Sequence, residues 1–209
     1  MSYFSGGKDS QCIYHLAKMA GVKFDAHYNV TTVDPPELMQ FIKKNYPDVI
    51  WELPELTMWE LIVKEGIPPM RNKRYCCRIL KERGGNNRIV LTGVRACESP
   101  KRMGRTMVRH CNKEAKTEVK VIIDWTDVEV WEFLRTNKIK HCKLYDEGFD
   151  RLGCVGCPNS NRKHGFNRWP TIKQKYIQSF EKMINSRKER GKRCAWKTGQ
   201  EVFDWWVGV

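Results

Sequence analysis

The sequence predicts an α/β protein with a parallel, five-stranded sheet and a basic, partly helical C-terminal extension. Three observations lead to this prediction. Short apolar runs alternate with helical periodicity up to residue 134, a glycine-rich turn joins the first strand to the first helix, and the alternation becomes irregular after residue 153. Strands that alternate with helices favour a parallel sheet, because each return crossing is made by a helix.

The first half of the chain supplies three of the five expected strands. A strand over 2–4 leads into a helix over 11–20, in which Ile13, Leu16 and Ala17 recur at helical spacing and which Gly21 ends. The next expected elements are a strand over 24–30, a helix over 37–45 that follows Pro35 and Pro36, a strand over 49–53 and a helix from Thr57 to Glu65.

The second half supplies the remaining strands and the extension. We expect strands over 88–92 and 119–123, a helix that Thr126 caps, and a basic amphipathic helix over 171–190. The chain is predicted to form one α/β domain over 1–158, with residues 159–209 as a helical extension packed on the same domain.

The charge and the cysteine content restrict the class of protein. The formal net charge is +14, which favours anionic partners such as nucleotides or nucleic acid. There is no apolar run of membrane-spanning length and no signal-peptide pattern, so we expect a cytoplasmic protein without membrane contact. Nine cysteines is an odd number, which argues against a disulfide framework and for metal or redox chemistry.

The turn after the first strand has the composition of an anion-binding loop. Its residues are Ser5, Gly6, Gly7, Lys8, Asp9 and Ser10. Glycines let the backbone approach an anion, and the following helix offers unpaired N–H groups and the positive end of its dipole. Lys8 adds a charge, the two serines add hydroxyl donors, and the acidic Asp9 caps the helix or orients the loop. The spacing differs from that of a Walker loop.

The SGGKDS loop resembles that of the PP-loop ATP pyrophosphatases and of the adenylyl-sulfate and phosphoadenylyl-sulfate reductases. This resemblance implies a doubly wound parallel sheet of the adenine nucleotide α-hydrolase-like fold, which binds its nucleotide at the carboxyl ends of the strands. It covers the chain from Ser5 to about Pro158.

A second basic motif follows the expected fourth strand, over residues 92–102. Arginine suits sulfate and phosphate because its guanidinium group can bind two oxygens at once. The segment resembles the TGxR-x-x-x-S-x-x-R stretch of the sulfonucleotide reductases. By that resemblance Arg95, Ser99 and Arg102 line the sulfate or phosphate pocket.

Two closely spaced cysteine pairs, Cys76-Cys77 and Cys154-x-x-Cys157, suggest a metal centre. The CxxC spacing directs two thiolates at one centre, while adjacent side chains diverge and fit different irons of a cluster better than one ion. A tetrahedral zinc site is the main alternative, and burial as small apolar residues is the third. The pattern is similar to that of the adenylyl-sulfate reductases, which implies that these four cysteines hold a [4Fe–4S] cluster.

The C-terminus departs from the reductase pattern. Those enzymes attack the sulfate sulfur with a cysteine in a Glu-Cys-Gly-Leu-His tail, which this chain lacks. Cys194 is the one cysteine of the C-terminal region, and the neighbouring Lys192 and Arg193 would favour its thiolate. It is the candidate nucleophile, with a structural role as the alternative.

The leading hypothesis is a thiol-dependent reductase of phosphoadenylyl sulfate or adenylyl sulfate, as in sulfate assimilation. It would release sulfite and an adenosine phosphate and would use thioredoxin or a glutaredoxin-like protein as reductant. The alternative is a PP-loop ATP pyrophosphatase that adenylates a nucleic acid for sulfur insertion, in tRNA thiolation or DNA phosphorothioation. The net charge and the missing tail favour the alternative, and both a nucleic-acid partner and a homodimer stay open.

Overall fold

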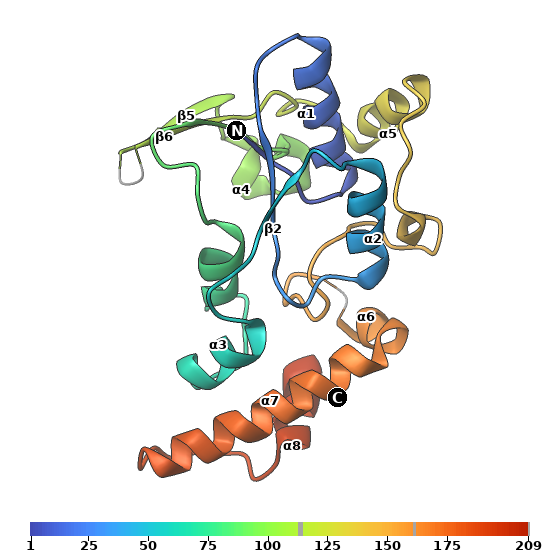
Figure 1. Ribbon diagram of the computed structural model, residues 1–209. Helices are drawn as coiled ribbons and strands as arrows, with labels where there is room; N and C mark the ends of the chain where they lie inside the picture. The colour runs from blue at the N-terminus through green and yellow to red at the C-terminus, as the bar shows by residue number, and fades with distance from the viewer. Residues whose placement is uncertain (113–114, 161, 209) are drawn as a thin grey trace. The chain divides into compact units, whose positions relative to one another are not determined.

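The computed structural model describes residues 1–112, 115–160 and 162–208, which group into two compact units (Figure 1). The first unit comprises Met1–Asn29, Pro36–Glu52 and Gly84–Leu152, and the second comprises Val30–Pro35, Leu53–Arg83 and Gly153–Val209. The expected division into 1–158 and 159–209 stays a prediction.

The first unit contains a six-stranded sheet with the order β3-β2-β1-β4-β6-β5. Five strands run parallel, and β5 pairs antiparallel with β6 at one edge. The strands are β1 (Ser2–Tyr3), β2 (Ala26–Asn29), β3 (Ile50–Glu52), β4 (Ile89–Leu91), β5 (Val108–Cys111) and β6 (Lys116–Val119). The chain crosses from β3 back past β1 to β4, so β1 and β4 lie at the switch point where such folds bind ligands.

Three longer helices accompany this sheet: α1 (Lys8–Met19), α2 (Pro36–Asn45) and α5 (Asp127–Thr136). Helix α1 lies beside α5, where Cys12 and Ile13 pack with Val130 and Leu134 in a fully buried cluster (Figure 1). The short helices η2 (Ala96–Glu98) and α4 (Pro100–Met103) lie between β4 and β5, and η4 (Lys143–Tyr145) follows α5. The buried cluster therefore packs α1 against α5.

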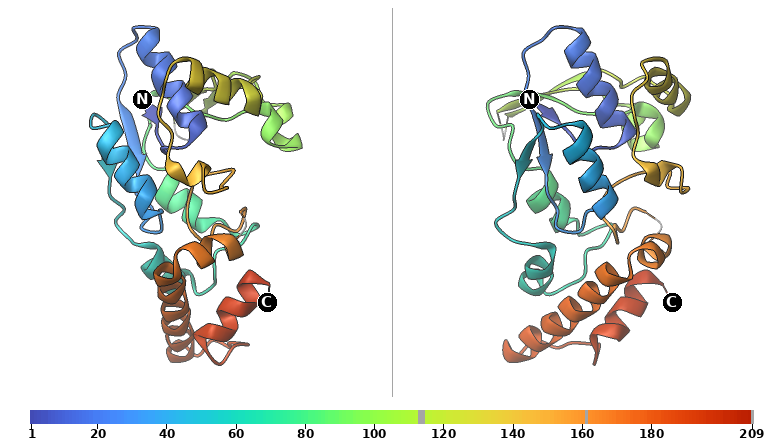
Figure 2. Two further views of the ribbon diagram at one scale, coloured as in Figure 1. Left: turned by 90° about the vertical axis from the view of Figure 1, so that its right-hand side faces the viewer. Right: turned by 45° about the vertical axis from the view of Figure 1, so that its right-hand side comes forward.

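The second unit is helical, with α3 (Met58–Glu65), the π-helical turn η1 (Cys77–Lys81), α6 (Arg162–Arg168), α7 (Pro170–Glu189) and α8 (Gly199–Val207). Thr57 and Glu60 form a capping box at the start of α3. Helices α7 and α8 lie side by side, and their contact buries Phe180 and Trp206 (Figure 2). Gly199 permits this close approach, because a Cβ there would lie 2.8 Å from the backbone nitrogen of Glu181.

The α/β class, the parallel core of the sheet and most predicted elements are confirmed, with one strand misplaced. The apolar run over 119–123 was expected to be the strand, yet β6 is Lys116–Val119 and the chain turns after it. Ile122 and Ile123 are buried from that turn, so their apolar character reflects core packing and not strand pairing. The hairpin partner β5 adds the sixth strand.

Candidate functional site

The SGGKDS loop follows β1 directly and is closed by its own serines. The Ser10 hydroxyl donates to the Gly7 carbonyl at 2.8 Å and accepts from the Ser5 amide at 3.2 Å. Gly6 has φ +71°, and a Cβ at this position would lie 2.7 Å from carbons of both Leu38 and Ile42. The tight turn and the close packing against α2 therefore both require glycine.

Helix α1 begins at Lys8 without a side-chain cap, since the N-cap residue is Gly7. The Lys8 amide donates instead to the Tyr145 hydroxyl at 2.8 Å, which η4 brings to the loop. The Lys8 ammonium group is buried and donates to the Asp150 carbonyl at 3.2 Å. The loop thus presents helix N-terminal amides and a fixed cation, the combination that binds anions.

Arg95 links the second motif to this loop. Its guanidinium group is buried and donates to Asp9 at 2.6 Å and to Asp127 at 2.8 Å. Burial raises the pKa of Asp9 although Arg95 and Lys8 oppose this effect. Burial alone would raise the pKa of Asp127, but hydrogen bonds from Lys8 and Arg95 outweigh this effect and lower the pKa. Both carboxylates hold Arg95 in place.

The rest of the second motif forms a local turn. The Arg95 amide donates to the Glu98 carboxylate at 2.9 Å, and the Arg102 guanidinium group pairs with the same carboxylate. Ser99 is half-buried before α4. Gly93 lets the end of β4 approach α1, because a Cβ there would lie 3.1 Å from the carbonyl carbon of Asp9. The structure thus joins Arg95 to the SGGKDS loop through Asp9, while the ion pair of Arg102 stays within the motif.

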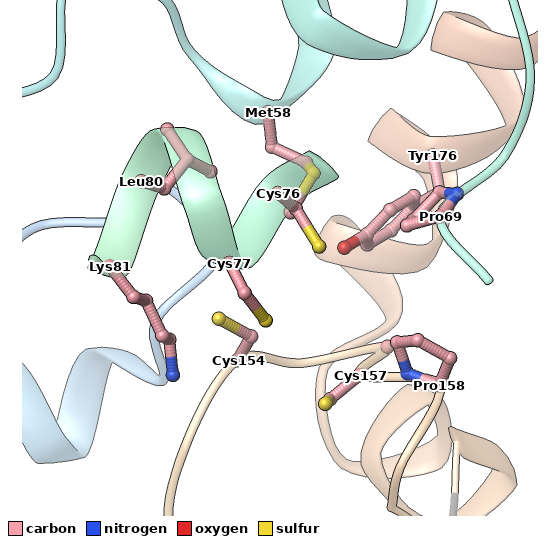
Figure 3. Close-up of a pocket in the computed structure, with 11 residues that line it drawn as sticks. Met58, Pro69, Cys76, Cys77, Leu80, Lys81, Cys154, Cys157, Pro158 and Tyr176 are labelled. Atoms are coloured by element: carbon pink, nitrogen blue, oxygen red, sulfur yellow. The ribbon is translucent and has the colours of Figure 1, made fainter. Parts of the chain in front are cut away.

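The four predicted cysteine ligands line one cavity of the second unit, which we call the cysteine pocket (Figure 3). Cys76 and Cys77 come from the start of η1, and Cys154 and Cys157 come from the segment before α6. The sulfur atoms of Cys77 and Cys154 point toward one another (Figure 3). The cavity has a volume of about 30 Å³.

Cationic side chains surround these thiols. Arg74 donates to the Cys77 sulfur at 3.3 Å. A hydrogen bond from Cys76, followed by the one from Arg74, lowers the pKa of Cys77, whereas the same thiol pair and burial raise the pKa of Cys76. The charge of Cys154 is the main cause that raises the pKa of the buried Lys81 ammonium group. The cysteine pocket therefore favours thiolate at one position and offers counter-charge to an anionic centre.

The donor set of the cysteine pocket fits a thiolate-bound metal or cluster, because four sulfurs from two segments converge beside two cations. Across 1–112, 115–160 and 162–208, no group of three or more His, Cys, Asp or Glu side chains is arranged to hold one metal ion in this conformation. The cysteine side chains would therefore have to rearrange to bind one centre together.

The remaining cysteines are distributed over both units, and all nine cysteines are free thiols. Cys12 and Cys142 are buried, while Cys194 is half-buried between α7 and α8. Cys97 is exposed, and its sulfur accepts a hydrogen bond from Arg95 at 3.1 Å. Cys97 is thus a second candidate thiol, at the carboxyl end of β4.

Sequence reasoning missed Asp127 and Tyr145. Asp127 follows the N-cap residue of α5, which is a common place for an acidic residue, so its side chain gave no functional signal. Tyr145 lies 137 positions from Lys8 and carries no motif of its own. Both residues reach the loop through tertiary folding alone.

Comparison with known proteins places this chain in a family. A model of the phosphoadenosine phosphosulfate reductase domain matches residues 1–160. An uncharacterised protein of Methanocaldococcus jannaschii is 31% identical over 199 residues, which are 90% of this chain and 47% of that protein. The adenosine 5'-phosphosulfate reductase 1 of Bacillus subtilis is 26% identical over 156 residues, which are 69% of this chain and 65% of the enzyme. A second uncharacterised M. jannaschii protein also matches this chain. The matched region covers 47% of the length of the first relative and 41% of the length of the second, which is less than half of each.

Solved structures share the fold of this chain. A phosphoadenylyl-sulfate reductase from Candida auris, solved as a phosphate complex, superposes with a TM-score of 0.55 at 16% identity, over 73% of this chain and 80% of that one. The FMN adenylyltransferase of Candida glabrata has a TM-score of 0.51 at 17% identity, over 74% and 54%. None of the described helices combines the length and apolarity that crossing a membrane requires. The fold is adenine nucleotide α-hydrolase-like, and the chain belongs to the phosphoadenosine phosphosulfate reductase family.

Proposed function

We propose that this protein is a thiol-dependent reductase of adenylyl sulfate or phosphoadenylyl sulfate. The observation that carries the proposal is the SGGKDS loop, in which Gly6 and Gly7 expose the start of α1 and Lys8 supplies a buried cation. Membership in the reductase family supports the same substrate class. Ser5, Ser10, Arg95, Ser99 and Arg102 are the further residues proposed to surround the sulfate or phosphate groups.

In the proposed reaction a cysteine thiolate attacks the sulfate sulfur. An S–S bond forms, the S–O bond to the phosphate breaks, and the adenosine phosphate leaves with the electron pair. A thiol of a thioredoxin- or glutaredoxin-like partner then attacks the cysteine sulfur, and sulfite leaves with the bonding pair. The partner's second thiol resolves the mixed disulfide and regenerates the cysteine, so two thiols supply the two electrons.

Cys194 is the proposed nucleophile, and Cys97 is the thiol against which it must be tested. Cys194→Ser is expected to abolish sulfite release, whereas Cys97→Ser is expected to retain it. The reverse result would transfer the role to Cys97, whose sulfur already contacts Arg95. Cys12→Ser serves as the control, because Cys12 is buried in the core of the first unit.

We further propose that Cys76, Cys77, Cys154 and Cys157 hold a [4Fe–4S] cluster, with zinc as the alternative. When bound, the cluster would supply a fixed charge distribution rather than transferable electrons. Anaerobic purification followed by iron, sulfide and zinc analysis separates the two. Cys157→Ser should lose the cluster absorbance while Cys142→Ser retains it, and a full iron content in Cys157→Ser would contradict the assignment.

The reaction itself is tested by offering the anaerobic protein adenylyl sulfate, phosphoadenylyl sulfate and ATP in turn. Sulfite release supports the reductase, with a loss of about 100-fold in kcat/KM for Lys8→Met because an oriented charge is removed. Lys18→Met is the matched control, since Lys18 lies in the last turn of the same helix and is half-exposed. Folded protein that releases no sulfite from either sulfonucleotide would refute the proposal.

A second candidate is an ATP pyrophosphatase that adenylates a nucleic acid for sulfur insertion. The net charge of +14 and the absence of the Glu-Cys-Gly-Leu-His motif favour it. Pyrophosphate release from ATP that depends on added tRNA or DNA would support this candidate.

A further inference from the structure

The cations of the SGGKDS loop are neutralised by carboxylates of the protein itself. Lys8 and Arg95 contribute two positive charges, and Asp9 and Asp127, with which they pair, contribute two negative ones. The formal charge of this four-residue network is therefore zero. An anionic ligand that approaches the loop meets cations that already have partners, so its affinity depends on whether a partner can leave.

Asp127 is the partner that can leave. One oxygen, Oδ1, contacts the Lys8 ammonium nitrogen at 3.2 Å and the Arg95 Nη2 atom at 2.8 Å. The Asp127 side chain is 59% exposed, whereas those of Lys8 and Arg95 are 8% and 4% exposed. Rotation of Asp127 would move its carboxylate into water. The buried cations of Lys8 and Arg95 would then both face the position that Oδ1 had occupied.

Asp9 does not share this freedom. Its side chain is 26% exposed, and it belongs to the first turn of α1, where it pairs with the Arg95 Nε atom at 2.6 Å. The close approach of Gly93 to Asp9 further restricts that turn. Asp9 therefore continues to orient Arg95 when Asp127 moves.

Tyr145 lies outside the loop and contributes a further hydroxyl donor to it. Its hydroxyl oxygen accepts from the Lys8 amide, and the hydroxyl proton has no acceptor among the residues that the structure describes. A Cβ at Gly7 would lie 3.4 Å from the Tyr145 hydroxyl and 3.5 Å from the Ser5 hydroxyl. Burial raises the pKa of Tyr145, so the group remains a protonated donor.

We propose that Asp127 and Tyr145 set the affinity of the SGGKDS loop for oxyanions in opposite directions. Asp127 is an internal competitor that occupies the position of one ligand oxygen, and Tyr145 donates its hydroxyl proton to the sulfate or phosphate group that displaces it. This assignment rests on the proposed function, because it takes the loop as the site of a sulfonucleotide.

The tighter binding expected for Asp127→Asn distinguishes the competitor role from a structural role. If Asp127 only stabilised the start of α5 and Tyr145 only braced the loop, removing either polar group would weaken binding or leave it unchanged. Removing a competing carboxylate from two cations should strengthen binding, and removing a donor should weaken it. General damage to the fold does not tighten a complex.

The test measures the affinity of the full chain for adenylyl sulfate and for inorganic sulfate by calorimetry. We expect Asp127→Asn to bind both about tenfold more tightly, because one opposing charge is removed. We expect Tyr145→Phe to bind both about tenfold more weakly, because one hydrogen bond to a charged group is lost. Thermal unfolding without ligand checks that each variant is folded.

Two matched variants serve as controls. Asp146→Asn removes an exposed carboxylate that pairs with His141, and Tyr14→Phe removes a hydroxyl that bonds to Asp48. Among the residues that the structure describes, neither group has a hydrogen bond or ion pair with the SGGKDS loop, so both variants should bind like the wild type.

The outcomes separate the inference from the proposed function. If wild-type protein binds adenylyl sulfate and Asp127→Asn binds it equally or more weakly, the competitor role of Asp127 is wrong although the function stands. If Tyr145→Phe binds like the wild type, the donor role of Tyr145 is wrong. If folded wild type and Asp127→Asn both fail to bind adenylyl sulfate, the proposed function itself fails.

Discussion

Replacing Gly6 by alanine should destabilise the protein by an amount that the structure allows to be estimated. Gly6 has φ +71°, which costs an L-residue about 1–2 kcal/mol. The new Cβ would lie 2.7 Å from carbons of Leu38 and Ile42, both fully buried, so neither can move into solvent. Overpacking of this kind costs about 1–3 kcal/mol. We therefore expect Gly6→Ala to lower the free energy of unfolding by about 2–5 kcal/mol.

Gly21→Ala is the matched control for this experiment. Gly21 has φ +65°, and a Cβ there would have no heavy atom within 4 Å, so only the backbone strain remains. Urea denaturation of the two variants should differ by about 1–3 kcal/mol, which is the overpacking contribution alone. Equal free energies of unfolding would refute the claim that the SGGKDS loop is packed tightly against α2.

Two further predictions concern stability. Gly199→Ala should lower the melting temperature by several degrees, because its Cβ would overlap the backbone of α7, whereas Gly165→Ala, with ordinary contacts from 3.7 Å, should not. A hydrogen bond from Arg88 is the main cause that lowers the pKa of Asp25 in the folded state, so this pair stabilises the fold above about pH 4 and loses its contribution as the pH falls further. Arg88→Gln should therefore flatten the decrease in unfolding free energy on acidification, and an unchanged slope would contradict this.

Local signals explain why much of the fold was predictable. The helix from Thr57 was expected at its observed start because threonine is a favoured N-cap residue, and the structure adds a capping box with Glu60. Gly21 ends α1 with positive φ, as expected from the sequence. The SGGKDS loop was identifiable because a strand, a glycine turn and a helix follow one another within ten residues.

Other features depend on contacts between distant residues. The run Val121 to Ile123 looks like a strand, yet it fills the core from a turn, while the more polar Lys116–Val119 pairs in the sheet. Tyr145 reaches the Lys8 amide from 137 positions away. Amino-acid pattern cannot reveal such contacts, because the residues involved have ordinary local settings.

The charge of the candidate site illustrates the same point and leads to a last prediction. The chain carries +14, but the network around Lys8 is formally neutral, so the overall charge does not describe the SGGKDS loop. A ligand held by a few buried donors loses little affinity in salt, whereas binding of a nucleic acid to a basic surface releases many counterions and weakens steeply. Titrations of adenylyl sulfate and of an oligonucleotide between 50 and about 200 mM salt should therefore differ in slope. A steep slope for adenylyl sulfate would show that the exposed basic surface, and not the buried pair Lys8 and Arg95, holds it.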